Sequence, residues 1–270
     1  MRLVTIILGT RPEAIKLAPV IKIFENCPHL DTRLILTGQH KEMVYQVLNI
    51  FKISPQKDLG LMTKNQTLTH ITFETLSGLE SDFNQYKPDL VIVQGDTSTA
   101  FAASLSAFYA KIPVAHVEAG LRTESKLNPY PEELNRRLIS QIADLHFAPT
   151  EIAKSNLNKS GIKNNIFITG NTVIDALLSI SNNVKAPVIK NLAWSNKKII
   201  LVTVHRRENW GNNLLDISIA IKELAQKRED ICFVIPMHKN KVVRQILEKE
   251  LSRIRNVFLI EPLNYDEQIG

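Results

Sequence analysis

The stretch RLVTIILGTRPEAIKLAPV (residues 2–20) contains a short apolar run, a glycine turn and the start of an amphipathic helix. The apolar run 2–8 has the length and composition of a buried strand, and Pro12 stands in the first helical turn, where proline is tolerated. A buried strand that passes through a glycine turn into a helix is typical of a doubly wound α/β domain. We therefore expect a parallel sheet that begins with this strand.

The alternation of apolar runs and helical patterns continues along the first part of the chain. Strands are expected at 2–8, 32–37, 89–94, 113–117, 144–148 and 165–168. Helices are expected between and after them at 12–26, 40–51, 67–86, 97–110, 131–143 and 150–159. This order predicts one Rossmann-like α/β domain over residues 1–170.

A second alternation follows a polar segment that contains proline. Residues 171–196 begin with a helical pattern and are expected to form a hinge region. Beyond it we expect a second Rossmann-like domain over 197–270, with strands at 198–204, 231–235 and 256–260 and helices at 213–227 and 241–253. Sheets commonly have about four to six strands, so this second domain is expected to be truncated in the present sequence.

The composition indicates a globular protein. The chain has 270 residues, of which 44% are hydrophobic and 22% charged, enough for two packed domains. No apolar run reaches the ~18 residues of a membrane span, and the amino terminus turns to glycine, proline and charge too soon for a signal peptide. We expect a cytoplasmic protein with no membrane partner.

Charge and cysteine content exclude two further classes. The net charge of +6 comes from scattered Lys and Arg residues, and the run 241–255 has the spacing of a solvated helix face, so no nucleic-acid partner is expected. A basic excess does suit an anionic small molecule. Cys27 and Cys232 stand far apart without metal-site spacing, which favours reduced thiols and no bound metal.

Charged side chains follow three of the expected strands. Arg11, Asp96 and Glu118 each come just after an apolar run. The carboxyl ends of parallel strands meet at one edge of a sheet, so these groups should share a crevice. Free N–H groups at the first helix amino terminus, with Arg11 and Lys16, would attract an anion. Cations beside carboxylates suggest acid–base chemistry on a phosphorylated substrate.

Each of these groups also has a purely structural interpretation. The turn 9–13 can be only a strand-to-helix connection, and Asp96 can cap the amino terminus of the following helix. Glu118 can form a salt bridge with Arg122. The acids at 132–133 stand in the first turn of a helix, where its dipole favours negative charge, and Lys16 alone would usually be solvated.

Two histidines follow strands of the second half. His205 and His238 each stand beside cationic residues after an apolar run, and their pairing favours a functional site at that sheet edge. Neither has carboxylate or thiolate ligands at metal-site spacing. The sequence also lacks the G-x-S-x-G, G-x-G-x-x-G and Walker A patterns of hydrolases, dinucleotide-binding proteins and P-loop proteins.

Several strings in the chain are similar to those of one enzyme family, and they occur in that family's order. They are GTRPEAIKLAPV (9–20), TGQH (37–40), GDTSTA (95–100), HVEAGLRT (116–123), PYPEELNRR (129–137), FITGNTVIDAL (167–177), VTVHRREN (202–209) and PMHKN (236–240). The chain thereby resembles the non-hydrolysing bacterial UDP-N-acetylglucosamine 2-epimerases. The resemblance implies two Rossmann-like domains of the GT-B type, with the nucleotide sugar in the cleft between them, and a homodimer.

The resemblance implies an isomerase that interconverts UDP-GlcNAc and UDP-ManNAc without NAD or another cofactor, for cell-surface polysaccharide synthesis. UDP would be eliminated to leave 2-acetamidoglucal and then added back with the proton on the opposite face of C2. The implied catalytic residues are Asp96, Glu118, Glu132 and His205, and the implied substrate-binding residues are Arg11, Lys16, His205 and Arg206. A second UDP-GlcNAc would bind as an activator at Gln39, Gln66, Glu132, Arg206 and His238.

The family pattern continues beyond the present residues to a DSGG-x-QEE segment that binds UDP and to a final helix. Three alternatives therefore stand beside the main interpretation. The chain can be a 2-epimerase of a modified UDP-HexNAc, a hydrolysing epimerase that releases free ManNAc, or an inactive, truncated nucleotide-sugar-binding fragment. The intact GTRPEAIK string (9–16) speaks against the hydrolysing enzyme.

Overall fold

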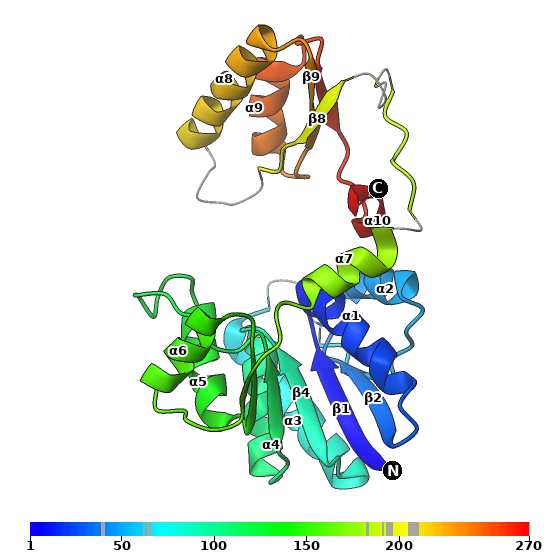
Figure 1. The fold of residues 1–270 in the computed structure, drawn as a ribbon, viewed down its shortest axis with the longest axis vertical. Helices are drawn as coiled ribbons and strands as arrows, with labels where there is room; N and C mark the ends of the chain where they lie inside the picture. Colours follow the sequence, from blue (N-terminus) through cyan, green and yellow to red (C-terminus); the bar gives the residue numbers. More distant parts are fainter. Residues whose placement is uncertain are drawn as a thin grey trace. The chain divides into compact units, whose positions relative to one another are not determined.

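The computed structural model describes residues 1–38, 41–61, 63, 66–181, 184–190, 192, 197–204 and 211–269. The chain divides into two compact units, Met1–Ser179 and Ile180–Gly270 (Figure 1). Most of the helix at the start of the expected hinge, Val173–Ser181, lies in the first unit, and its last two residues belong to the second. The domain boundaries 1–170, 171–196 and 197–270 stay predictions.

The first unit contains a parallel sheet of seven strands. They are β1 (Arg2–Leu8), β2 (Leu30–Leu36), β3 (Lys57–Asp58), β4 (Leu90–Gln94), β5 (Val114–Val117), β6 (Leu145–Ala148) and β7 (Ile166–Ile168), in the order β3-β2-β1-β4-β5-β6-β7. Successive strands are added outward in one direction from β1 to β3 and in the other from β4 to β7. The order therefore reverses between β1 and β4, and such a switch point is where doubly wound sheets bind ligands.

Helices cover both faces of this sheet (Figure 1). The helices of the first unit are α1 (Arg11–Glu25), α2 (Lys41–Ile50), α3 (Leu68–Tyr86), α4 (Ser98–Tyr109), α5 (Glu132–Ile142), α6 (Glu151–Lys159) and α7 (Val173–Ser181). Side chains alternate along a strand, so Ile6 packs with Leu17 of α1 and Leu48 of α2, whereas Ile7 packs with Phe83 of α3 and Ile139 of α5. Two buried layers thus hold β1 at the centre of the unit.

The second unit has a smaller parallel sheet in its described residues. Its elements are β8 (Lys198–Leu201), α8 (Asn212–Lys227), β9 (Ile231–Pro236), α9 (Lys241–Leu251), β10 (Val257–Ile260) and α10 (Tyr265–Ile269), and the strand order is β10-β9-β8. Leu214 of α8 and Leu247 of α9 pack with Phe233 of β9 in one apolar cluster. Cys232 lies buried in β9, and both it and Cys27 are free thiols.

The expected strands and helices are present with small shifts at their ends. The sequence analysis missed β3 and α10. The two-residue strand Lys57–Asp58 has no apolar run that could predict it, and its pairing with Ile35 and Leu36 depends on β2. None of the described helices combines the length and apolar character that crossing a membrane requires.

Candidate active site

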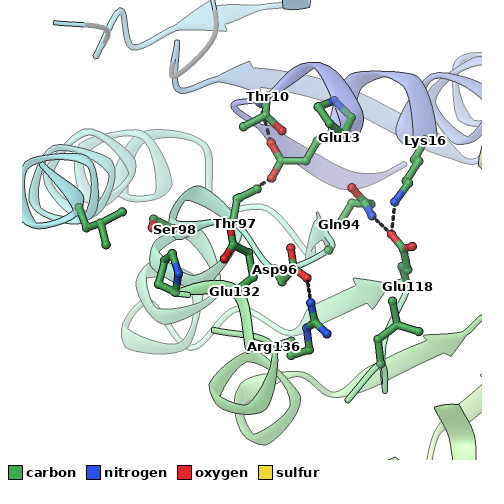
Figure 2. Close-up of a pocket in the computed structure, with 15 residues that line it drawn as sticks. Thr10, Glu13, Lys16, Gln94, Asp96, Thr97, Ser98, Glu118, Glu132 and Arg136 are labelled. Atoms are coloured by element: carbon green, nitrogen blue, oxygen red, sulfur yellow. Dashed lines mark hydrogen bonds and ion pairs between the residues drawn. The ribbon is translucent and has the colours of Figure 1, made fainter. Parts of the chain in front are cut away.

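A cavity of about 450 Å³ lies where β1, β4 and β5 end, beside the switch point of the first sheet. Amino-terminal residues of α1, α4 and α5 form its walls (Figure 2). The lining residues are Thr10, Pro12, Glu13, Lys16, Leu68, Gln94, Gly95, Asp96, Thr97, Ser98, Glu118, Leu121, Pro131, Glu132 and Arg136. The parallel topology therefore brings together four of the residues singled out in the sequence, Lys16, Asp96, Glu118 and Glu132.

The backbone at Gly9 packs closely against two side chains beside this cavity. A Cβ atom at Gly9 would lie 2.3 Å from Thr37 Oγ1 and 2.6 Å from Thr99 Oγ1. These two hydroxyls, from the end of β2 and from α4, form a buried hydrogen bond of 3.0 Å. Glycine is required here because the backbone after β1 passes close to both side chains.

Glu118 stands directly after β5 with its backbone in the left-handed region, at a φ of 67°. Lys16 Nζ donates to Glu118 Oε2 at 2.5 Å, and Gln94 Nε2 donates to the same oxygen (Figure 2). Asn171 Nδ2 donates to Oε1 at 3.1 Å. The ionic partner of Glu118 is therefore Lys16. The alternatives of a Glu118–Arg122 salt bridge and of a solvated Lys16 are wrong, since Arg122 instead donates to Ser140 Oγ and the Lys16 side chain is only 23% exposed.

Asp96 follows β4 and pairs with Arg136 of α5 (Figure 2). Asn135 Nδ2 also donates to the Asp96 backbone carbonyl at 2.9 Å. The amino-terminal cap of α4 is Thr97, whose hydroxyl accepts from Ala100 N at 3.0 Å, so the interpretation of Asp96 as that cap is wrong. Burial raises the pKa of the Asp96 carboxyl, although the Arg136 guanidinium opposes the shift.

The two adjacent acids that open α5 differ in their surroundings. Glu132 lines the cavity, and its buried Oε2 has no hydrogen-bond partner among the described residues. Glu133 is fully buried, accepts from Thr123 N at 3.1 Å and from Arg137 Nε at 2.7 Å, and also pairs with Arg136. Glu133 is thus a structural anchor, whereas Glu132 keeps one carboxylate oxygen available at the cavity.

Glu13 is a cavity residue that the sequence analysis missed. Its carboxylate Oε2 accepts from Gly9 N at 2.8 Å and from Thr10 N at 2.7 Å, and Thr97 Oγ1 donates to Oε1 at 2.6 Å. Burial raises the pKa of Glu13, although these three hydrogen bonds oppose the shift. The spacing Thr10-x-x-Glu13 is that of a capping box and was the available signal. Glu13 thus occupies the amides of Gly9 and Thr10, which precede the first helical residue, Arg11.

His116 supports the loop that carries Asp96. Its side chain is completely buried in β5, and its Nε2 lies 2.7 Å from the backbone oxygen of Gly95. A ring nitrogen facing a carbonyl oxygen must carry the proton, so Nε2 is the donor. Burial lowers the pKa of His116 to about 4. The imidazole is therefore neutral near pH 7.

The other residues singled out in the sequence are more scattered. Arg11 begins α1 but does not line the cavity, and Gln66 accepts from Thr63 N at 3.4 Å outside the lining. His238 is exposed after β9 in the second unit, where Asn240 N donates to its Nδ1. Three residues, Gln39, His205 and Arg206, lie outside the described residues. The described part of the chain holds no cluster of His, Cys, Asp or Glu suited to a metal ion.

Comparison with known proteins gives matches over nearly the whole chain. A family model described as UDP-N-acetylglucosamine 2-epimerase matches residues 22–269. The UDP-N-acetylglucosamine 2-epimerase of Campylobacter jejuni is 47% identical over 278 residues, which cover 98% of this chain and 73% of that protein.

Solved structures agree with these matches. The UDP-GlcNAc 2-epimerase of Neisseria meningitidis bound to UDP-GlcNAc is 46% identical with a TM-score of 0.89, over 100% of this chain and 74% of that one. The enzyme of Methanocaldococcus jannaschii in complex with UDP-GlcNAc and UDP is 35% identical with a TM-score of 0.77, over 98% and 75% of the two chains. These similarities confirm the expected parallel α/β fold of the GT-B type.

Proposed function

Because the chain belongs to the UDP-N-acetylglucosamine 2-epimerase family, we propose that it interconverts UDP-GlcNAc and UDP-ManNAc and that the cavity of the first unit holds the reacting sugar. Relatives at this level of identity carry that activity in their names, and two solved relatives hold UDP-GlcNAc. The remaining question is how the residues of the cavity perform the reaction.

The chemistry of the substrate favours an elimination. C2 of the sugar has no neighbouring carbonyl carbon that could stabilise a carbanion, so simple removal of its proton is difficult. In an elimination, a base takes the C2 proton, the C2–H electron pair forms a C1=C2 double bond, and the C1–O bond breaks with its electron pair on UDP. The intermediate is 2-acetamidoglucal. Addition of UDP at C1 and of a proton to the opposite face of C2 then gives the epimer.

Such a reaction needs acid–base groups at C2 and positive charge at the departing diphosphate. Asp96, Glu118 and Glu132 are the candidates for the proton transfers. Lys16 and Arg136 are described cations in the same lining, and the amino termini of α4 and α5 point positive dipole ends to the cavity. We assign Arg11, His205 and Arg206 to substrate binding or UDP departure by family resemblance, as we do the activator site of Gln39, Gln66, Glu132, Arg206 and His238.

The observation that carries the proposal is the arrangement of Asp96 and Glu118. Both carboxylates line one cavity, yet each is held by a different cation on a different helix, Arg136 of α5 for Asp96 and Lys16 of α1 for Glu118. Inversion at C2 requires proton transfer on both faces of the ring. Two separately held carboxylates can serve two faces, whereas a single one cannot. By family resemblance alone, we also propose that the enzyme is a homodimer, that it is cytoplasmic and that it needs no cofactor.

Solvent isotope exchange tests this function. The protein is incubated with UDP-GlcNAc in deuterated water, and products are analysed by NMR and mass spectrometry. We expect UDP-ManNAc with deuterium at C2, deuterium in the recovered UDP-GlcNAc, and traces of 2-acetamidoglucal with UDP. Epimerisation without deuterium at C2 would contradict the proton transfers, and free ManNAc as the main product would indicate the hydrolysing reaction. Preference for a modified UDP-HexNAc in a competition assay would change the substrate assignment.

A further inference from the structure

Glu13 is a buried acid of the cavity to which the reaction above gives no role. Its side chain is 1% exposed, and its three hydrogen bonds all go to protein atoms. Oε2 accepts from the amides of Gly9 and Thr10. Oε1 accepts from the Thr97 hydroxyl, and Figure 2 shows the contacts of Glu13 with Thr10 and Thr97. The contact with Thr97 joins two segments that are 84 positions apart in the sequence.

Capping of α1 explains only half of this arrangement. One carboxylate oxygen suffices to bind the two amides, and that oxygen is Oε2. The hydrogen bond from Thr97 Oγ1 to Glu13 Oε1, 2.6 Å long, links α1 to the start of α4. Thr97 Oγ1 already accepts from Ala100 N, so its hydroxyl hydrogen is directed to Glu13. The Glu13 carboxylate therefore ties together the amino termini of two helices.

These two helix starts carry the groups that the reaction needs. Lys16, one turn after Glu13 on α1, binds Glu118. Thr97 directly follows Asp96. The bond between Glu13 and Thr97 thus connects the helix that holds Glu118 to the residue beside Asp96, across the switch point between β1 and β4.

We propose that Glu13 is a positioning residue of the epimerase, which sets the separation of Asp96 and Glu118 through its hydrogen bond to Thr97. The proposal rests on the function proposed above and extends it to a residue that does not take part in proton transfer. Reacting groups must stay within a fraction of an ångström of the productive geometry, and a displacement of about 1 Å can lower a rate by about 10²-fold.

Two substitutions alter the connection from opposite ends. Glu13→Gln keeps an oxygen for the amides of Gly9 and Thr10 and replaces the charged acceptor by an NH2 group, which can only donate to Thr97. Thr97→Val removes the hydroxyl with little change in size, and with it the cap of α4. We expect each variant to lower kcat by about 10- to 100-fold with KM changed by less than about threefold. The double variant should be no slower than Thr97→Val alone, because that variant already lacks the bond.

The ratio of products gives a readout that a merely structural role would not move. Displaced carboxylates should return the proton to C2 poorly, so more 2-acetamidoglucal should be released per epimer formed. Thr150→Val is the matched control, because the Thr150 hydroxyl caps α6 by accepting from Ala153 N at 3.2 Å and does not line the cavity. It should lower thermal stability as the loss of a cap does, with kcat and the glucal ratio unchanged.

Two results would overturn the positioning role. One is a folded Glu13→Gln or Thr97→Val variant, verified by circular dichroism, with the kcat and glucal ratio of the unmodified protein. The other is a double variant in which the two losses multiply as independent effects. Deuterium exchange by the unmodified protein separates the two proposals. If the unmodified protein incorporates deuterium at C2 and both variants have its kcat and glucal ratio, only the role of Glu13 is wrong. If the unmodified protein incorporates no deuterium at C2, the proposed reaction itself is wrong.

Discussion

Lys16 and Glu118 form an ion pair with an Nζ–Oε2 distance of 2.5 Å, although they stand 102 positions apart in the sequence. The pair depends on the sheet order, which places β1 with its helix α1 within reach of the end of β5. The Glu118 side chain is only 12% exposed, so its charge has little water around it. The positive charge of Lys16 therefore compensates the negative charge of this carboxylate in the cavity.

We predict that Lys16→Met lowers kcat/KM by about 10²-fold, because it removes the cation that holds Glu118 and that we propose to stabilise the departing diphosphate. The same substitution at Lys22 is the control. Lys22 forms a similar ion pair with Glu25 on α1 at 2.7 Å, but its side chains are more exposed, at 41% for Lys22 and 36% for Glu25. Steady-state kinetics should show normal values for Lys22→Met. Equal losses of kcat/KM in the two variants would mean that activity depends on the lysines of α1 in general and not on the ion pair in the cavity.

Asp96→Asn and Glu118→Gln should each reduce kcat by about 10²–10⁴-fold while substrate binding changes much less, because acid–base groups contribute mainly in the transition state. Kinetics together with equilibrium binding of UDP-GlcNAc would measure both quantities. Glu25→Gln, an exposed acid on α1, serves as the control and should leave kcat unchanged. A variant of Asp96 or Glu118 with near-normal turnover would remove that residue from the catalytic set.

Part of this site could be predicted from the sequence. The parallel topology follows from alternating strands and helices, and it places Asp96 and Glu118 at one sheet edge because each lies within two residues of a strand end. Three cap-forming residues in a row, Asp96, Thr97 and Ser98, could each have started α4. Only the folded backbone shows that Thr97 does so and leaves Asp96 for the cavity.

Contacts between distant segments could not be predicted. Thr10-x-x-Glu13 has the spacing of a local helix cap, and nothing in that spacing predicts the bond from Thr97. Arg136 stands one helical turn after Glu132 among several charged residues, and its pairing with Asp96 depends on how α5 packs beside α4.

His116 should make stability depend on pH. Burial holds its folded pKa at about 4, below the ordinary histidine pKa of 6.5, so the unfolded chain binds the proton more readily between these values. The stabilising contribution is complete above pH 6.5 and is lost as the pH falls towards 4, on the order of 3 kcal/mol in all. His116→Gln should remove that part of the pH dependence in urea unfolding. His146, whose pKa burial also lowers, is present in both proteins. Parallel curves for the two proteins would contradict a buried, neutral His116.

Gly120 and Gly161 provide a matched test of the backbone after Glu118. Both have a φ of 89°, but a Cβ atom at Gly120 would lie 2.3 Å from the Ala153 carbonyl oxygen, whereas nothing lies within 4 Å at Gly161. Gly161→Ala should cost only the left-handed strain of about 1–2 kcal/mol. Gly120→Ala should cost about 1–3 kcal/mol more, because backbone atoms of α6 must move. Thermal unfolding of both variants would measure the difference, and equal losses would show that the close approach to α6 does not constrain this turn.

The most direct test of the proposed reaction follows the bond that must break. UDP-GlcNAc is prepared with a heavy oxygen isotope in the bridge between C1 and the β-phosphorus, and the protein is allowed to bring it to equilibrium with UDP-ManNAc. If UDP departs and returns, the β-phosphate can rotate in between, and the account predicts that the label spreads into the non-bridging oxygens while epimerisation proceeds. Full epimerisation with the label retained in the bridge would show that the C1–O bond stays intact and would contradict the elimination mechanism.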